Sequence, residues 1–131
     1  MEIILSEPIE PSRVYKLIRK AIAGSVVLHF GVVRESTGNK TIKSIEFVPS
    51  GNVEEELRTI SEEIRKRWTI EDVLIMRRLG RLNIGDIISL VAVSSPHRGE
   101  AFDACRDGVD RLKKMSTIVK NEIFQEKALL K

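Results

Sequence analysis

Two apolar runs, SVVLHFGVV (25–33) and IISLVAVSS (87–95), restrict the fold of this chain more than any other feature. Both runs are rich in β-branched residues, and runs of this length and composition are typical of strands buried in a sheet. The second run is followed directly by Pro96, which suits the first turn of a helix. The sequence therefore predicts at least one sheet, and a helix after residue 95.

Three segments carry apolar side chains at the spacing of an amphipathic helix. The first begins at Ser12 and is ended by Gly24, the second follows Asn52, which is a plausible N-cap, and the third follows Pro96. The expected buried faces are formed by Val14, Leu17, Ile18, Ala21 and Ile22, by Val53, Leu57, Ile60, Ile64 and Trp68, and by Phe102, Cys105, Val109 and Leu112.

The remaining segments complete a mixed pattern of strands and helices. RESTGNKT (34–41) reads as a polar loop, NIGD (83–86) as a hairpin turn and QEKALLK (125–131) as a tail. Helices and strands do not alternate strictly, so we predict an α+β fold with mixed, largely antiparallel strands and three helices. The chain has 131 residues, which predicts a single domain over 1–131. Further strands are expected at 2–5, 41–48, 71–79 and 117–124.

Composition argues against several classes of function. The 22 Lys and Arg and 19 Asp and Glu are mixed along the chain with a net charge of +3, which fits a small anionic ligand better than a nucleic acid. No run reaches the length of a membrane span, and the start does not resemble a signal peptide. Two histidines and one cysteine cannot supply a conventional zinc site, and no phosphate-binding loop appears, so we expect no metal and no cofactor.

Three residues that could carry chemistry are more simply explained by packing. Cys105, the single cysteine, allows no internal disulfide and suits a reducing cytoplasm; we expect it to be a buried core residue. His29 lies inside an apolar strand and is expected in the core or at an interface. Trp68 closes the apolar face of the second helix and is expected to pack against the core.

Five cations remain as candidates for a site. His97 and Arg98 stand at the start of a predicted helix, where an anion would satisfy both side chains and the free N–H groups, although a capping histidine beside a solvated arginine explains them too. Arg34 directly follows a strand and could face the same anion or only solvent. The helix dipole suffices to explain Lys113, whereas Lys120 lies in a largely apolar segment, where a lysine can lose its proton and act as base or nucleophile.

Longer motifs tie these residues together. R-x-G-R-L-x-x-G-D (78–86), S-S-P-H-R-x-x-A-F-x-A (94–104) and D-x-L-K (110–113) follow one another, with G-V-V-R (31–34) and I-E-F-V-P (45–49) upstream. In composition and spacing they resemble the large, catalytic subunit of molybdopterin synthase. The resemblance covers about residues 24–124, which is most of the chain.

The resemblance implies a fold, a reaction and partners. The fold would be the α/β-hammerhead fold of that subunit. The reaction would convert cyclic pyranopterin monophosphate (precursor Z), an anionic pterin phosphate, to molybdopterin by installing two sulfurs. The sulfur would come from the C-terminal Gly-Gly thiocarboxylate of a small ubiquitin-like subunit. Two large subunits would form the central homodimer of a heterotetramer in the cytoplasm.

The resemblance also assigns roles to the five cations. Lys113 and Lys120 match the family's catalytic lysines, and Arg34, His97 and Arg98 match its substrate-binding residues. Residues 98 and 113 lie roughly 22 Å apart along one straight helix, so that helix cannot bring both to one small substrate. Either they serve different parts of the reaction, or the second subunit of the dimer completes the site. Our hypothesis is that His97 and Arg98 of one subunit face Lys113 and Lys120 of the other.

One segment departs from the family pattern and leaves alternatives open. The family usually reads Pro-x-Trp-Lys-(Lys/Arg)-Glu around the second lysine, whereas this chain reads TIVKNE (117–122). The loop at Arg34 is shorter than usual, and Val48 stands where an aromatic residue is common. The main alternative is therefore a catalytically impaired family member that acts as a binding or scaffold protein for the small subunit. A small anion-binding regulatory domain is a second alternative.

Overall fold

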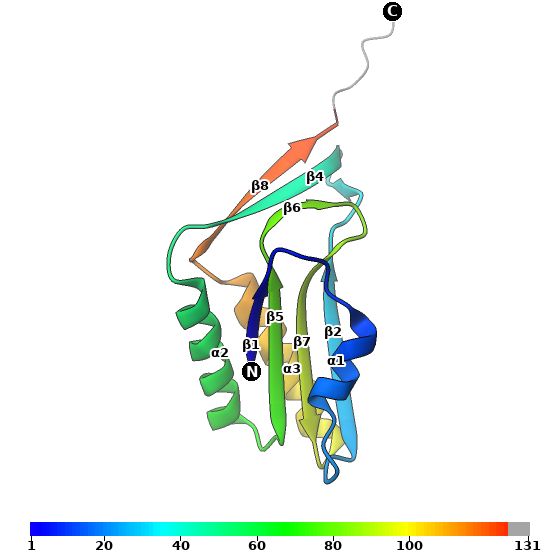
Figure 1. Ribbon diagram of the computed structural model, residues 1–131, viewed down its shortest axis with the longest axis vertical. Helices are drawn as coiled ribbons and strands as arrows, with labels where there is room; N and C mark the ends of the chain where they lie inside the picture. Colours follow the sequence, from blue (N-terminus) through cyan, green and yellow to red (C-terminus); the bar gives the residue numbers. More distant parts are fainter. Residues whose placement is uncertain (126–131) are drawn as a thin grey trace, which may run out of the picture.

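A four-stranded sheet, called here the main sheet, forms the middle of the molecule (Figure 1). The computed structural model describes residues 1–125. The strand order of the main sheet is β1 (Glu2–Leu5), β5 (Asp72–Arg78), β7 (Ile87–Ser95) and β2 (Ser25–Val32). β5 pairs in parallel with β1 and antiparallel with β7, which pairs antiparallel with β2, so the two long apolar runs are neighbours as strands.

A second sheet crosses one end of the main sheet (Figure 1). Its central strand, β4 (Lys40–Pro49), pairs with β6 (Gly80–Asn83) and with β8 (Ile118–Phe124), and the short β3 (Ser36–Thr37) pairs with the beginning of β4. All of these pairings are antiparallel. The alternation expected for residues 41–48 is interrupted by a shift of register between Ile42 and Ser44, so that Ser44 and Ile45 are both buried. Ile42, Ile45 and Phe47 belong to a core of their own.

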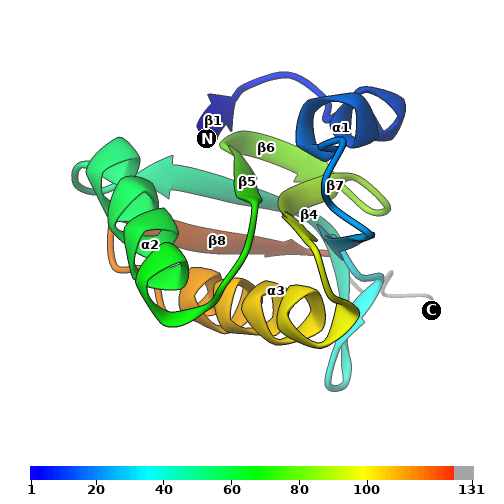
Figure 2. The same cartoon turned by 90° about the horizontal axis from the view of Figure 1, so that it is seen from below.

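Three helices cover the main sheet from both sides. Figure 2 shows α1 (Pro11–Ile18) on one side, and α2 (Val53–Arg67) and α3 (Arg98–Lys113) on the other. Successive side chains of a strand point to opposite faces, so Val73 and Ile75 of β5 pack under α2 and α3, while Leu74 and Met76 pack under α1. The α+β class with three helices and largely antiparallel strands is thus confirmed.

Local expectations for α2 and the core are confirmed. The Asn52 side chain caps α2 by accepting a hydrogen bond from the Glu55 backbone N–H at 3.0 Å. Trp68 packs against the core and donates its indole N–H to Asp107 at 3.0 Å, which links the end of α2 to α3. Cys105 is buried in the same core.

The expected extents of α1 and α3 need correction. α1 ends at Ile18, because Arg19 has extended backbone angles, and Leu17 and Ile22 are exposed rather than buried. α3 begins at Arg98, two residues after Pro96. Phe102 was expected on the buried face and is 58% exposed.

Phe102 is exposed because α3 lies close to the main sheet and turns a different face toward it than the sequence suggested. A Cβ atom added to Gly108 would lie 2.9 Å from a methyl group of Val91, so only a small residue fits there. The buried face therefore consists of small residues, and the large Phe102 side chain points away from it. These small buried residues are Ala101, Ala104, Cys105 and Gly108.

Two short strands were not expected from the sequence. β3 lies inside the predicted loop 34–41, and β6 lies between the two strands that a hairpin was expected to join. The tight turn at 83–86 is present, with Gly85 at a φ of 88°. However, β6 and β7 on either side of the turn belong to different sheets. The predicted tail at 125–131 falls, apart from residue 125, outside the described residues.

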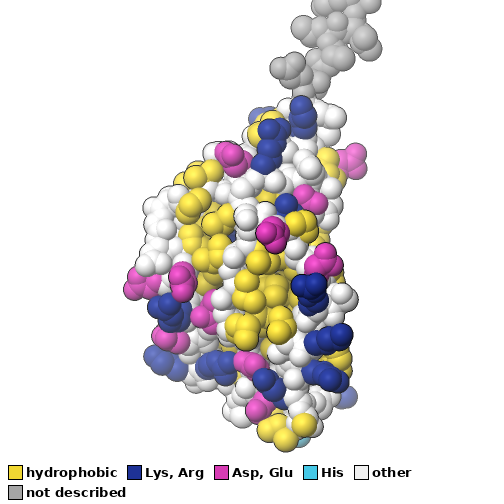
Figure 3. Space-filling model, in the orientation of Figure 1, with side chains coloured by type: hydrophobic (Ala, Val, Ile, Leu, Met, Phe, Trp, Pro, Cys, Tyr) yellow, Lys and Arg dark blue, Asp and Glu magenta, His cyan; other side chains and the backbone are white. Residues whose placement is uncertain are grey.

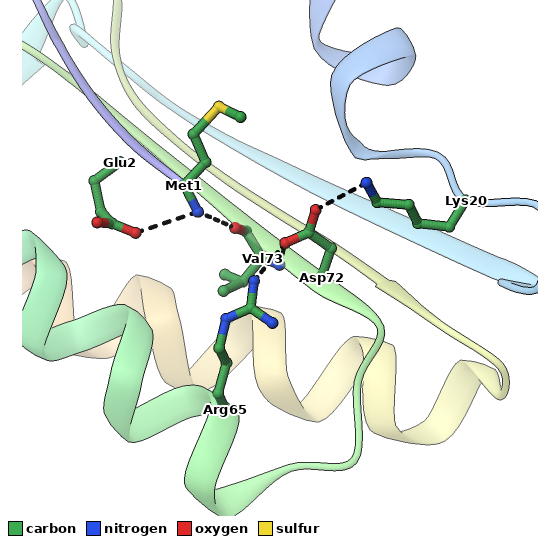
Figure 4. A network of polar contacts seen from close by, with 6 residues as sticks. All are labelled: Met1, Glu2, Lys20, Arg65, Asp72 and Val73. Carbon is green, nitrogen blue, oxygen red and sulfur yellow. Dashed lines mark hydrogen bonds and ion pairs between the residues drawn. The ribbon is translucent and has the colours of Figure 1, made fainter.

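A polar network at the beginning of β5 joins this strand to α2 and to the segment that follows α1 (Figure 4). Asp72 accepts hydrogen bonds from Arg65 of α2 and from the Val73 backbone N–H, and Lys20 lies 3.4 Å from its other carboxylate oxygen. Burial alone raises the pKa of Asp72, but these contacts outweigh it and lower the pKa below its ordinary value. The network ties α2 and the segment after α1 to the main sheet.

The surface carries no dominant charge on the face shown in Figure 3. Basic and acidic side chains are interspersed around its edge, and hydrophobic side chains gather near its middle. Within residues 1–125, no helix is long and apolar enough to cross a membrane.

Candidate active site

A cavity of about 630 Å³ lies at the C-terminal end of α3. Its lining comes from both sheets and from this end of the helix, and it brings together residues that are far apart in the sequence. The main sheet contributes His29, Gly31, Ile88, Ser89 and Arg77, the second sheet contributes Phe47, Ile118 and Lys120, and the end of α3 contributes Val109, Leu112 and Lys113.

Strand register explains why the cavity is polar. Arg77 of β5 stands opposite Ser89 of β7, which stands opposite Gly31 of β2. Arg77 follows Ile75 by two positions and therefore shares the sheet face that α2 and α3 cover. At Gly31 an added Cβ would lie 2.6 Å from the Ser89 hydroxyl oxygen, so glycine leaves room for that hydroxyl. The sheet face thus changes from apolar to polar near the end of α3.

Three of the five predicted site residues line this cavity. Arg34 lies two residues after the end of β2, Lys113 ends α3 and Lys120 belongs to β8. The Lys120 ammonium lies 3.2 Å from a carboxylate oxygen of Glu122, and the lysine side chain is 53% exposed. The expectation that Lys120 sits in apolar surroundings is therefore wrong, because its strand lies at the edge of a sheet and presents it to solvent.

The other two predicted residues lie elsewhere. His97 is the N-cap residue of α3 and Arg98 its first residue, at the opposite end of the helix from Lys113, and both are exposed. Among the described residues, the His97 side chain makes no capping hydrogen bond, so the plainer explanation of a capping histidine finds no support. Within one chain, the structure does not bring His97 and Arg98 to the cavity.

Two residues of the cavity were missed or misjudged from the sequence. His29 was expected in the core or at an interface; it is exposed and lines the cavity, so the core placement is wrong. Arg77 was not singled out, although it occupies an inward-facing position in the alternation of Val73 and Ile75. A charged residue at such a position was the signal that could have revealed it.

The Arg77 guanidinium is buried, with 8% of the residue exposed. It donates a hydrogen bond to the Ile88 carbonyl at 3.3 Å and lies 4.3 Å from the centre of the Phe47 ring. Burial lowers the pKa of Arg77 to about 10, which still leaves it charged at neutral pH.

The cavity is suited to an anion. Its described lining includes four cationic side chains, Arg34, Arg77, Lys113 and Lys120, and no aspartate or glutamate. Partial burial strengthens the attraction between such charges and a negatively charged ligand. In the part of the chain that the structure describes, no three His, Cys, Asp or Glu side chains are grouped so that they could hold a metal ion.

Glu56 of α2 fixes the turn between α3 and β8. Its carboxylate accepts hydrogen bonds from the backbone N–H groups of Ser116 at 3.0 Å and Thr117 at 3.1 Å, and from the Thr117 hydroxyl at 2.6 Å. Burial alone raises the pKa of Glu56, but the hydrogen bonds from Thr117 and Ser116 outweigh it and lower the pKa. This turn joins Lys113 to Lys120, so Glu56 helps to position both ends of the cationic cluster.

Comparison with known proteins places this chain in one family. The family described as MoaE protein matches residues 4–115 of the chain. A molybdopterin synthase catalytic subunit from a Nostoc species is 37% identical over 123 residues, which cover 91% of this chain and 73% of the relative. The chain belongs to the MoaE family, and the resemblance seen in the sequence is confirmed.

Solved structures agree with this assignment. The crystal structure of molybdopterin synthase from Staphylococcus aureus matches with a TM-score of 0.87 at 33% identity, over 95% of this chain and 92% of that one. A complex of subunits 1 and 2 of molybdopterin-converting factor from Helicobacter pylori matches with a TM-score of 0.74 at 16% identity, over 96% and 86%, and shows similarity of fold. The expected fold is therefore confirmed.

Proposed function

We propose that this chain is the catalytic subunit of a molybdopterin synthase and converts cyclic pyranopterin monophosphate to molybdopterin by sulfur transfer. The observation that carries the proposal is the convergence of Arg34 with Lys113 and Lys120, which are far from it in the sequence, on one cavity. Membership of the MoaE family supports it. No observation favours the catalytically impaired alternative.

The cavity supports distinct roles for its cations. Lys113 stands beside the carbonyl of the incoming thiocarboxylate and stabilises the tetrahedral intermediate electrostatically. Arg34 binds anionic or polar parts of the pterin by charge-assisted hydrogen bonds. Lys120, with Glu122 beside it, positions the substrate or moves protons during rearrangement of the ring and phosphate.

The proposal includes the assembly in which the reaction takes place. A small ubiquitin-like subunit delivers the sulfur on its C-terminal Gly-Gly thiocarboxylate, and two catalytic subunits form the centre of a heterotetramer in the cytoplasm. His97 and Arg98 of one catalytic subunit complete the cavity of the other, because within one chain they lie at the far end of α3 from Lys113. Residues 1–131 act as one domain, which is supported by the packing of Ile118 against the cores of both sheets.

Product formation tests the proposed function. The protein is mixed with a thiocarboxylated small subunit and cyclic pyranopterin monophosphate, and the dithiolene is detected by mass spectrometry after alkylation. We expect the addition of two sulfurs. Lys113→Ala should lower the rate by about 10²–10³-fold, the range seen when one group that stabilises an oxyanion is removed. Lys114→Ala is the matched control, since its side chain is exposed and does not line the cavity.

Two outcomes would contradict the proposal. Formation of the complex without sulfur transfer would favour the binding-protein alternative. Equal rates for the Lys113→Ala and Lys114→Ala variants would show that Lys113 has no role in sulfur transfer.

A further inference from the structure

We propose that Arg77, which lies outside the set of site residues taken from the family, binds the phosphate group of the substrate inside the cavity. The inference rests on the proposed function and adds a specific subsite to it. It starts from the observation that Arg77 is a buried cation that lines the cavity and has no anionic partner among the described residues.

Burial of Arg77 is not offset by a counter-ion. With 8% of the residue exposed, the guanidinium has lost most of its contact with water. Among the described residues, no carboxylate lies within ion-pair distance of it, and its one hydrogen bond goes to the neutral carbonyl of Ile88. A buried charge that is not paired lowers stability, and an anionic ligand would offset that cost.

Free donors of Arg77 are available to such a ligand. A guanidinium has five N–H groups, and the structure gives a partner to one of them. None of the Arg77 nitrogens is both sealed from solvent and without a partner. Because Arg77 lines the cavity, a ligand bound there would be close to its remaining N–H groups.

The surroundings of Arg77 hold its guanidinium in place. Phe47 covers the guanidinium at 4.3 Å from the ring centre, and the Ile88 carbonyl holds one end of it. A planar fork held in this way matches the oxygen atoms of a phosphate, which it can bind through two parallel hydrogen bonds. Ser89 stands opposite Arg77 across the strand pair, and Arg34, Lys113 and Lys120 are the other charged groups that line the cavity.

The reaction involves two anions, and burial favours the phosphate as the partner of Arg77. A peptide C-terminus that arrives from solvent can reach the exposed Lys113 without entering fully. Arg77 is far less exposed, so it suits a group that enters the cavity whole, as the phosphate of a small pterin does.

The test compares Arg77→Gln with Arg58→Gln. Arg58 is exposed on α2 and paired with Glu54, so the control removes the same charge away from the cavity. Thermal unfolding is measured with and without millimolar inorganic phosphate, and KM is measured for cyclic pyranopterin monophosphate. Phosphate should raise the Tm of the wild type and of Arg58→Gln but not of Arg77→Gln. The KM of Arg77→Gln should rise about 10–100-fold, as expected for loss of hydrogen bonds to a charged group, with affinity for the small subunit unchanged.

Arg77→Lys keeps the charge and removes the fork, and it guards against a glutamine variant that fails to fold. We expect it to fold and to show an intermediate KM.

Three results would overturn the proposal. Phosphate could stabilise Arg77→Gln as much as the wild type. The KM could stay unchanged while Tm falls equally with and without phosphate, which would give Arg77 a purely structural role. Weakened binding of the small subunit, with phosphate binding intact, would mean that Arg77 binds the C-terminal thiocarboxylate of that subunit instead.

A separate outcome distinguishes this proposal from the proposed function. If the wild type shows no turnover while phosphate binding still depends on Arg77, the proposed function fails and the anion site stands.

Discussion

Cys105 illustrates at the scale of one residue how its surroundings decide its chemistry. The thiol is buried against the main sheet, with its sulfur 3.6 Å from the Val91 carbonyl oxygen. Burial raises the pKa of the Cys105 thiol to about 11. The thiolate is the reactive form of cysteine, so this side chain is not suited to carry sulfur through a covalent intermediate.

Two measurements on Cys105 follow. Native protein at neutral pH should react with iodoacetamide about 100-fold more slowly than the urea-unfolded chain, because each pKa unit lowers the thiolate fraction tenfold. The Cys105→Ala variant should keep its rate of sulfur transfer and lose about 1 kcal/mol of stability, a typical cost for a small change in a core. Rapid alkylation of the native protein, or loss of transfer in a folded Cys105→Ala variant, would show that this account of the thiol is wrong.

At the scale of elements, the contact between α2 and the turn from α3 to β8 explains how the chain accommodates Thr117, which departs from the family pattern. Where the family usually has proline, Thr117 offers a backbone N–H and a hydroxyl, and Glu56 accepts a hydrogen bond from each. Proline could supply neither donor. The change therefore brings its own anchoring contact, which keeps the turn between Lys113 and Lys120 in place.

The Thr117→Pro variant tests this explanation. Although it restores the usual residue of the family, it should lower stability and reduce turnover, because Glu56 loses two donors. Thr117→Val, which removes only the hydroxyl, should have the smaller effect. Denaturant unfolding and the sulfur-transfer assay measure both. A Thr117→Pro protein with wild-type stability would mean that the contact with Glu56 contributes little.

Glu56→Gln should lower the free energy of unfolding by about 1 kcal/mol, the size of a typical hydrogen-bond contribution. The folded-state pKa of Glu56 is lowered from its ordinary value of 4.5, so its contribution is present above that value and is lost as the pH falls through the folded-state pKa. Denaturant unfolding at about pH 7 and about pH 3 should therefore show a difference between variant and wild type that shrinks in acid. Glu55→Gln, in the same first turn of α2, controls for the helix dipole. A difference that stays constant with pH would contradict the role of the charge.

At the scale of the whole molecule, the separation of Arg98 from Lys113 predicts a site shared between two subunits. Arg98→Ala and Lys113→Ala proteins should each be inactive. When they are unfolded together and refolded, about a quarter of wild-type activity should return, because half of the dimers are mixed and each has one intact site. Mixed refolding of Lys113→Ala with Lys120→Ala is the control; both lysines lie in one cavity, so it should restore nothing. No recovery in the first mixture would place each site within one chain.

The parts of the fold that could be predicted from the sequence are those set by interactions between neighbouring residues. The long strands and α2 were predictable because alternation, helical spacing and the Asn52 cap are written in neighbouring residues. The orientation of Phe102 was not, since it depends on how closely α3 approaches the main sheet. β6 was missed because its residues form a strand only by pairing with β4, which is far away in the sequence.

The candidate site shows the same division. Arg34, Lys113 and Lys120 were chosen from the sequence, but only through resemblance to a family, since no spacing rule brings them to one cavity. Arg77 was missed because its importance arises from Ser89, which the strand register places opposite it, and from Phe47, which the second sheet brings to its guanidinium.

The pairing of β8 with β4 has a consequence for how the protein is made. This pairing joins Ile42 to Phe124, so it cannot form until nearly all of residues 1–125 have been synthesised. Contacts between such distant segments also slow folding, since a long loop must close before they form. Lys120 joins the other cations only when β8 docks, so a partly synthesised chain cannot bind its ligand at a half-built site.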